Sequence, residues 1–133
     1  MKTECTPTDL RSGRLGTREI RAGFDGGKLS SDGGAILLRM TEQRTRLLRR
    51  FAGCFRDYRS ESWVEHSVEE LVAQRVMGLV LGYEDLNDHD RLRFDTLLAV
   101  AVGKREPESR KKRAQDEPAL ASSSTLNRLE LAS

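Results

Sequence analysis

The sequence predicts a mostly α-helical protein, a bundle of four to six short helices with flexible ends. Apolar residues recur at a period of 3.6 residues in several segments after residue 35, which is the pattern of helices with one buried face. A capping box at Ser67 marks the start of one of these helices. Apolar residues alternate over residues 19–24, which predicts a small strand or hairpin near residues 19–29.

The N-terminal part is predicted to run from a leader into a strand and a turn. Residues 1–18 show no apolar period and are rich in Thr, Gly and charge, so we expect a disordered leader there. Ile20, Ala22 and Phe24 then alternate with smaller or more polar residues, as in a short strand. Two glycine pairs follow and allow the backbone to turn sharply before the first helix.

Residues 35–55 carry the first helical pattern. Apolar side chains fall roughly on one stripe of a helix, at Ile36, Leu37, Met40, Leu47, Leu48, Phe51 and Phe55. The segment from Glu42 to Arg46 is polar, which predicts two short helices that meet at a bend. A polar connector follows over residues 57–62.

The strongest local signal begins at Ser67. In the sequence Ser67-Val68-Glu69-Glu70, the side chains of Ser67 and Glu70 can each accept the other's backbone N–H, which defines a capping box. Gly82 is placed to close the helix that follows. The side chains predicted to share its buried face are Val68, Leu71, Val72, Val76, Leu79 and Val80.

Further helix starts are predicted in the second half of the chain. Asn87 or Asp88 can cap a helix of one or two turns, and Asp95 can cap a helix over residues 97–102. Residues 104–118 have no periodic apolar face, which predicts an exposed basic linker. Leucines within residues 119–133 predict a final small helix capped near Ser123 or Ser124. The helical region is thus expected to span residues 19–103.

Composition excludes several classes of protein. Apolar residues make up 37% and charged residues 33% of the 133 residues, which favours one small domain with unfolded segments. Cys5 and Cys54 are too few for a disulfide scaffold and lack zinc-ligand spacing. The sequence has neither a signal peptide nor an apolar stretch long enough to span a membrane. We therefore expect a soluble cytoplasmic protein without a membrane partner.

Charge is segregated along the chain. Residues 10–59 hold 12 basic and 5 acidic side chains, whereas residues 61–99 hold 3 basic and 9 acidic ones. Candidate contacts to DNA phosphates are Arg39, Arg44, Arg46, Arg49, Arg50, Arg110, Lys111, Lys112 and Arg113. An ordinary solvated surface explains the same pattern, so charge alone leaves both interpretations open.

One cluster of acidic residues is the place to look for metal chemistry, because divalent cations prefer carboxylate oxygens. Its members are Glu84, Asp85, Asp88, His89 and Asp90. The calcium-loop template fails here because Thr96 occupies its closing position. Helix capping by Asn87 and Asp88 accounts for these residues instead, so we predict no metal site. No nucleophile motif accompanies either histidine, and we assign no catalytic residue.

Five segments resemble a known family when taken in order: residues 24–34, 64–71, 81–93, 97–104 and 120–126. The plainest of them, residues 81–93, reads Leu-Gly-Tyr-Glu-Asp-Leu-Asn-Asp-His-Asp-Arg-Leu-Arg. Together they resemble the group-one DDE transposase family of bacterial insertion sequences. The positions that match the family motif are Asp25, Gly26, Gly27, Ser31, Asp32, Gly33, Gly34, Glu65, His66, Ser67, Gly82, Tyr83, Glu84, Asp85, Asn87, Asp88, Asp90, Arg91 and Arg93.

The resemblance implies DNA transposition by a ribonuclease-H-like core whose three carboxylates use Mg²⁺. Family members are several times longer, and we expect this chain to end about where that core begins. No acid of this chain therefore matches a catalytic carboxylate, and no cofactor is assigned to the chain itself. The implied partners are DNA at the element ends, a second copy of the chain, or the full-length transposase.

Three functions remain open at this point. The favoured one is an N-terminal transposase region that contributes DNA or partner contacts. The alternative is an interaction remnant, which binds full-length transposase as an inhibitor or has no activity. A small metal nuclease rests only on the acidic cluster and ranks last.

Overall fold

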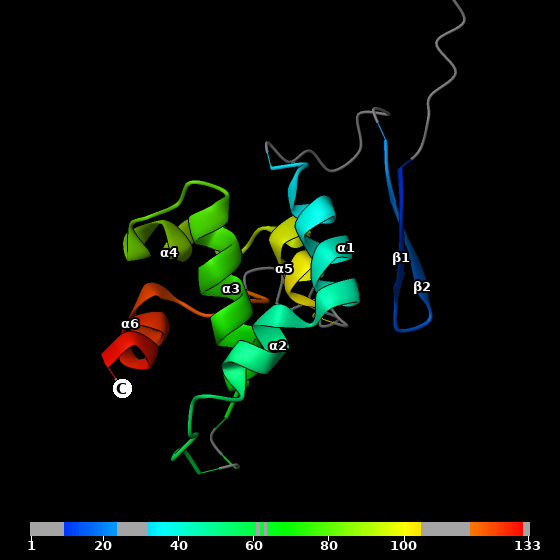
Figure 1. The fold of residues 1–133 in the computed structure, drawn as a ribbon. Coiled ribbons are helices and arrows are strands. Elements are labelled where there is room, and N and C mark those ends of the chain that lie inside the picture. Colours follow the sequence, from blue (N-terminus) through cyan, green and yellow to red (C-terminus); the bar gives the residue numbers. More distant parts are fainter. Residues whose placement is uncertain (1–9, 24–31, 61, 63, 105–117, 132–133) are drawn as a thin grey trace, which may run out of the picture.

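A computed structural model describes residues 10–23, 32–60, 62, 64–104 and 118–131. In chain order the elements are β1 (Leu10–Leu15), β2 (Arg18–Ala22), α1 (Ala35–Thr45), α2 (Leu47–Ala52), α3 (Val68–Val80), the 3₁₀ turn η2 (Leu86–Asp88), α4 (His89–Leu92), α5 (Thr96–Val102) and α6 (Ser123–Leu131). The longest helix, α3, runs through the middle of the bundle, and the hairpin stands beside α1 (Figure 1). The prediction of a mostly α-helical protein with a small N-terminal hairpin is confirmed.

The hairpin lies nearer the N-terminus than predicted. Leu10 pairs with Ala22 and Leu15 with Arg18 in an antiparallel register. Gly16, with φ 61°, is the first of the two residues that connect the strands, where type II′ hairpin turns prefer glycine. Residues 10–18 therefore belong to the hairpin, which corrects the expectation of a leader over residues 1–18. Residues 24–29 of the predicted hairpin range lie outside the described residues, as do 105–117 of the predicted linker.

A β-bulge hides β1 from the sequence pattern. Arg11 pairs with Arg21 and Arg14 with Glu19. Three residue steps along β1 therefore lie opposite two residue steps along β2. Gly13, with φ 74°, lies within the bulge. Ser12 and Leu15 are both buried as a result, although they lie three positions apart along the strand. The alternation that identifies a half-buried strand is thereby lost.

The helices α1 and α2 meet at a bend, as the polar segment predicted. Arg46 makes the bend with left-handed backbone angles, φ 53° and ψ 33°. Both carboxylate oxygens of Glu42 accept hydrogen bonds from backbone N–H groups of α2, at 2.9 Å from Leu48 and 3.1 Å from Arg49. Glu42 thus caps the second helix from within the first.

The apolar stripe predicted across this bend is only partly buried. Ile36 lies in the core, whereas Leu37, Leu47 and Phe51 are exposed. One periodic stripe requires one helix axis, and the left-handed residue at the bend interrupts that axis.

The limits of α3 agree with the sequence prediction. Ser67 accepts the backbone N–H of Glu70 at 3.2 Å, and the Glu70 carboxylate accepts the N–H of Ser67 at 3.1 Å. At the other end Gly82 has φ 96°, and the N–H of Tyr83 donates to the carbonyl of Gly78 at 2.9 Å. This is the hydrogen bond of a Schellman motif, which glycine closes without strain.

The buried face of α3 is rotated from the predicted one. It is centred on Leu71, Gln74 and Gly78, which lie about one helical turn apart. Leu79 and Val80, which were predicted to face the core, are 44% and 62% exposed. A polar residue and a glycine at the middle of a buried face carry no apolar signal, so the sequence pattern placed this face wrongly.

Carboxylates start the short helices that follow. Asp85 accepts the N–H of Asn87 at 2.9 Å and opens η2. Asp95 accepts the N–H of Leu98 at 2.8 Å and opens α5, as predicted. Asp88 stands at the N-cap position of α4 without a side-chain capping bond. The expected cap by Asn87 or Asp88 is instead made by Asp85, two residues before Asn87 and three before Asp88.

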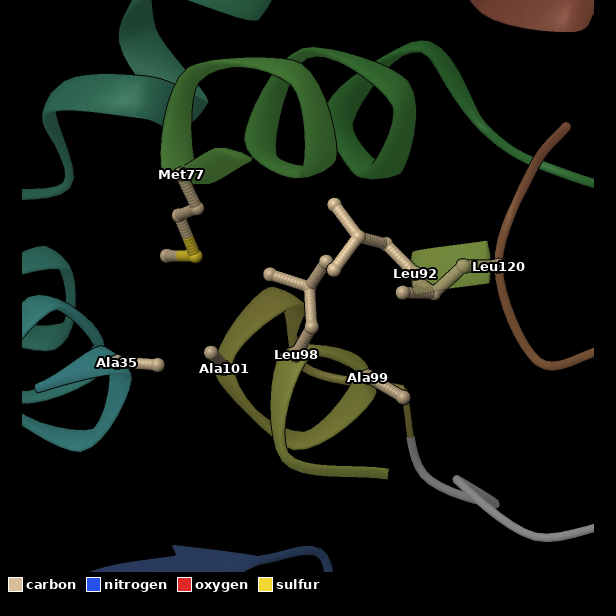
Figure 2. Close-up of a cluster of buried hydrophobic side chains, with 7 residues drawn as sticks. All are labelled: Ala35, Met77, Leu92, Leu98, Ala99, Ala101 and Leu120. Atoms are coloured by element: carbon tan, nitrogen blue, oxygen red, sulfur yellow. The ribbon is translucent and has the colours of Figure 1, made fainter. Parts of the chain in front are cut away.

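One apolar cluster connects α1, α3, α4, α5 and the segment before α6 (Figure 2). Its buried members are Ala35, Met77, Leu92, Leu98, Ala99, Ala101 and Leu120. Alanine holds three of these seven positions, so α1 and α5 can pack with their backbones close together. A second cluster of Leu71, Ala121 and Leu126 attaches α6 to α3.

Gly78 makes room on α3 for the imidazole of His89 on α4. A Cβ atom at residue 78 would lie 2.8 Å from Cε1 and 3.0 Å from Nε2 of His89. The histidine is completely buried, so its ring cannot move into solvent to relieve such a clash. The close approach of the two helices therefore requires glycine at this position.

The substitution Gly78→Ala should destabilise the protein, although alanine is the better helix former. We expect a net loss of up to about 2 kcal/mol in the free energy of unfolding, because overpacking costs about 1–3 kcal/mol and helix propensity returns about 1 kcal/mol. Urea denaturation followed by circular dichroism measures it. In a His89→Ala background the same substitution should cost much less, and an undiminished cost would contradict this explanation.

Candidate nucleic-acid interface

The basic residues predicted to contact DNA separate into one buried arginine and an exposed group. Arg39 is only 6% exposed. The exposed group is Arg44, Arg46, Arg49 and Arg50. The remaining candidates, Arg110, Lys111, Lys112 and Arg113, lie outside the described residues.

Arg39 holds the hairpin against the bundle. Its Nη1 donates to the carbonyl oxygen of Val100 and its Nη2 to that of Arg14, both at 3.0 Å. One guanidinium thus joins α1 to β1 and to the C-terminal turn of α5, where carbonyl groups carry partial negative charge. Burial lowers the pKa of this guanidinium. Because solvent barely reaches Arg39, it is not among the residues that a DNA phosphate can contact, which corrects the prediction.

The four exposed arginines lie at the end of α1, at the bend and in α2. Arg44 lies in the last turn of α1, and Arg49 and Arg50 lie in the last turn of α2. Within the described part of the chain, their one ion pair joins Arg49 to Glu69 of α3 at 3.8 Å, with both side chains more than half exposed. A pair of that kind contributes little stability. A polyanion in solution can therefore reach this group.

A second group of arginines was missed at the sequence level. The hairpin carries Arg11, Arg14, Arg18 and Arg21, and all four are exposed. The composition of residues 10–22, with four arginines and one acidic residue, was the sequence feature that could have identified this group. The sequence does not group these side chains, because residues 1–18 lack the apolar period that would predict an element there.

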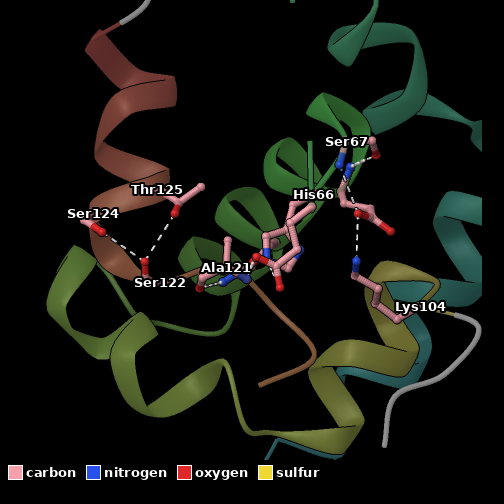
Figure 3. A network of polar contacts seen from close by, with 10 residues as sticks. His66, Ser67, Lys104, Ala121, Ser122, Ser124 and Thr125 are labelled. Carbon is pink, nitrogen blue, oxygen red and sulfur yellow. Dashed lines mark hydrogen bonds and ion pairs between the residues drawn. The ribbon is translucent and has the colours of Figure 1, made fainter. Parts of the chain in front are cut away.

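At the centre of the motif region lies the carboxamide of Gln74, on the buried face of α3. Its Nε2 donates to the carbonyl oxygen of Ala121 at 2.9 Å, and its Oε1 accepts the N–H of the same residue at 2.9 Å. Figure 3 shows this contact at Ala121. The side chain therefore pairs with the segment before α6 as a strand backbone would. A third contact joins Nε2 to Nδ1 of His89 at 3.2 Å.

These contacts define the protonation of His89. The amide nitrogen of Gln74 is a donor, so Nδ1 of His89 accepts and the ring proton lies on Nε2. That Nε2 has no hydrogen-bond partner within the described residues, and it faces the backbone of Gly78. Burial lowers the pKa of His89, and the nearby Arg75 lowers it further. His89 is thus a neutral packing residue of the core.

Two charged residues attach α6 to the rest of the bundle. Asp90 accepts the N–H and the hydroxyl of Ser123 at 3.0 and 2.9 Å, and these bonds hold the pKa of Asp90 below its usual value. Arg75 donates to the carboxylate of Glu130 at 2.6 Å and to the carbonyl oxygen of Glu84 at 3.0 Å. The cap predicted near Ser123 is therefore supplied from α4, 33 residues earlier.

The other motif segments also make structural contacts. The hydroxyl of Tyr83 donates to Asp32 at 2.8 Å and links the turn after α3 to the start of α1. The capping-box residue Glu70 also accepts from Nζ of Lys104 at 2.9 Å, which ties the start of α3 to the end of α5 (Figure 3). His66, just before this box, is buried, and burial lowers its pKa.

The remaining positions of the family motif that the structure describes lie at the surface or at its edge. The exposed ones are Gly33, Gly34, Glu65, Ser67, Gly82, Glu84, Asp85, Asn87, Asp90 and Arg91. Asp88 and Arg93 are half-buried, and the Arg93 guanidinium lies 5.1 Å from the ring centre of Phe94. The positions Asp25, Gly26, Gly27 and Ser31 lie outside the described residues.

The described residues do not bring together three His, Cys, Asp or Glu side chains that could hold a metal ion. In the cluster at residues 84–90, Asp85 and Asp90 accept hydrogen bonds at the starts of η2 and α6 instead. The Mg²⁺ that the family resemblance implies therefore finds no fitting ligand set in this part of the chain. None of the described helices has the length and apolarity needed to cross a membrane.

Fold and contacts together define a small helical module in which the sequence motifs hold helices in place and two groups of arginines reach the surface. The family described as "Transposase DDE domain group 1" matches residues 12–133, so the chain belongs to this transposase family. Membership implies a role in transposition and DNA as a partner. Neither the curated proteins nor the solved structures contained a match to the chain.

The substitution Arg39→Ala should detach the hairpin and lower stability. It removes two hydrogen bonds from a charged donor, for which we expect a loss of about 2–4 kcal/mol in the free energy of unfolding. Urea denaturation gives the loss, and amide hydrogen exchange shows whether β1 opens first. The control Arg44→Ala on the same helix is exposed and should change stability by less than about 0.5 kcal/mol. Equal losses in the two variants would refute the anchoring role.

Stability should decrease as the pH falls below about 6.5, the ordinary pKa of histidine. Burial lowers the folded-state pKa of His89 and of His66, so the unfolded chain binds more protons in this range and protonation favours unfolding. The loss should level off once the pH lies below both folded-state values. Free energies of unfolding measured between neutral and mildly acidic pH should show a shallower slope for His89→Gln than for the wild type. Identical slopes would exclude His89 as a source of the effect.

Proposed function

We propose that this chain is a DNA-contacting region of a transposase and that it contributes phosphate contacts rather than the catalytic carboxylates. The observation that carries the proposal is the exposed group Arg44, Arg46, Arg49 and Arg50, four arginines within residues 44–50. Family membership supports DNA as the polyanion that these side chains meet.

Arginine suits this role because its planar guanidinium donates two parallel hydrogen bonds to a phosphate. The acidic residue nearest to the group along the chain is Glu42, and both of its oxygens already accept backbone N–H groups. The carboxylate therefore faces the backbone of α2 and not the arginine side chains. The surface around the bend keeps an excess of positive charge as a result.

The purified chain should bind duplex DNA with an affinity that falls steeply as salt increases. For each arginine that contacts a phosphate, substitution should reduce the slope of log affinity against log salt by about 0.9. We would compare the wild type with Arg44→Gln/Arg49→Gln/Arg50→Gln by fluorescence anisotropy over a salt series. Arg46 stays unchanged in this variant because its left-handed backbone shapes the bend.

The control for this variant is Arg91→Gln/Arg128→Gln, which removes two exposed charges from α4 and α6, against three in the variant. The control should leave the salt slope unchanged, and circular dichroism should show native helix in every variant. A folded wild type that does not bind DNA at low salt would overturn the proposal.

A contact with another transposase subunit is the second candidate. The adjacent apolar residues Leu79 and Val80 are exposed at the end of α3, where a partner subunit would bury them. If this second function is correct, the folded chain should associate with a tagged full-length family member in the absence of DNA. The variant Leu79→Ser/Val80→Ser should then abolish that association and leave the affinity for DNA unchanged.

A further inference from the structure

We propose that one side of α2, formed by Leu47, Arg50 and Phe51, binds unpaired nucleotides, so that the chain prefers DNA with unpaired bases to a regular duplex. The inference rests on the proposed function, because it takes DNA as the polyanion, and it adds which form of DNA the site selects. The guanidinium group meets the phosphate of a nucleotide, and the phenyl ring stacks on its base.

Helical spacing brings these three side chains to one side of α2. Leu47, Arg50 and Phe51 stand at positions i, i+3 and i+4, which are neighbours on a helix surface. The helix packs on α3 (Figure 1), and its inner side holds the buried Ala52 and the half-buried Leu48, which packs against the main apolar cluster. Leu47 and Phe51 remain 62% and 48% exposed, so a ligand can reach them from solvent.

The ring of Phe51 is held in place by Phe55. Their ring centroids lie 5.3 Å apart and their planes meet at 89°, an edge-to-face arrangement that aromatic pairs favour. Phe55 is itself half-buried, so it supports the Phe51 ring from the protein side. A ring that already has a fixed neighbour loses little conformational freedom when a base stacks on its exposed part.

The guanidinium of Arg50 is open to a phosphate. In the described part of the chain, the one ion pair of the α1–α2 arginines joins Arg49 to Glu69 of α3 and leaves Arg50, which is exposed, without an acidic partner. Glu42, the acid nearest to α2 along the chain, uses both carboxylate oxygens to accept backbone N–H groups. A phosphate at Arg50 therefore does not displace an acid that the structure places there.

The combination of an arginine with an exposed aromatic ring favours unpaired nucleotides over a regular duplex. In a duplex the bases stack on each other, so a side chain at its surface meets phosphates, sugars and the edges of bases. Arginines alone suffice for such contacts, and Phe51 would find no base face to cover. An unpaired nucleotide presents a phosphate and a base face together, which matches Arg50 beside Phe51. The positive charge around the ring favours this polyanion over an apolar protein surface.

Three labelled DNA probes with equal numbers of phosphates test the inference on the full 133-residue chain by fluorescence anisotropy. The first is a fully paired duplex, the second contains a short unpaired loop, and the third has the same loop built from abasic nucleotides. The wild type should bind the second probe about tenfold more tightly than either of the others, because one stacked base contributes about that much. Phe51→Ala should remove this preference and keep the affinity for the paired duplex within about twofold, since phosphate contacts remain.

The matched control is Phe94→Ala, which removes a phenylalanine of similar exposure, 51%, from outside α1 and α2. This control should keep the preference for the unpaired loop, and circular dichroism should show native helix in both variants. The variant Phe51→Leu keeps an apolar side chain against Phe55 but has no aromatic face, so it should lose the preference as Phe51→Ala does.

Equal affinities of the wild type for all three probes would overturn the inference and leave the proposed function in place. The inference is also wrong if Phe51→Ala keeps the loop preference, or if it loses affinity for every probe alike. Loss of association with a tagged full-length family member in Phe51→Ala, without any loop preference in the wild type, would make this side of α2 a protein contact instead. A wild type that binds none of the probes would remove the proposed function itself. Should neither Phe51 variant fold, the wild type decides through its affinities for the normal and the abasic loop.

Discussion

The carboxamide of Gln74 lies where α3, α4 and the segment before α6 meet, and it is 1% exposed. Burying an amide without partners costs several kcal/mol, roughly 2–7 by transfer measurements, so this position is tolerable only because the amide is paired. It forms two hydrogen bonds with the backbone of Ala121 and one contact with His89. The neutral imidazole in turn needs the open backbone of Gly78. Much of the bundle therefore depends on one buried polar side chain and on the glycine one turn away.

The motif at residues 81–93 can be understood from this constraint. Asp85 opens η2, Asp90 caps α6 from a distance, and Tyr83 reaches back to the start of α1. The acidic residues that suggested metal chemistry are thus, where their contacts are described, helix caps and connections. The motif residues with described contacts thus join short helices, which could not be stable alone.

Arginine has two different uses in this protein. Arg39 is buried, binds carbonyl groups and fixes the hairpin to α1 and α5. The arginines of the bend, of α2 and of the hairpin are exposed. The buried arginine thereby fixes the strand from which the exposed arginines of β1 project.

The sequence by itself determined the features whose hydrogen bonds join residues within one or two helical turns of each other. The capping box of Ser67 and Glu70, the glycine end at Gly82, the cap by Asp95 and the bend before α2 follow from neighbouring residues. Only the tertiary structure decided that Arg39 is buried, that Gln74 faces the core and that Asp90 caps Ser123. Partners 25 to 61 residues apart make these contacts. A local sequence pattern predicts the hydrogen bonds that a residue can form with its near neighbours in the chain. Whether that residue is buried depends on which distant segments the folded chain packs against it.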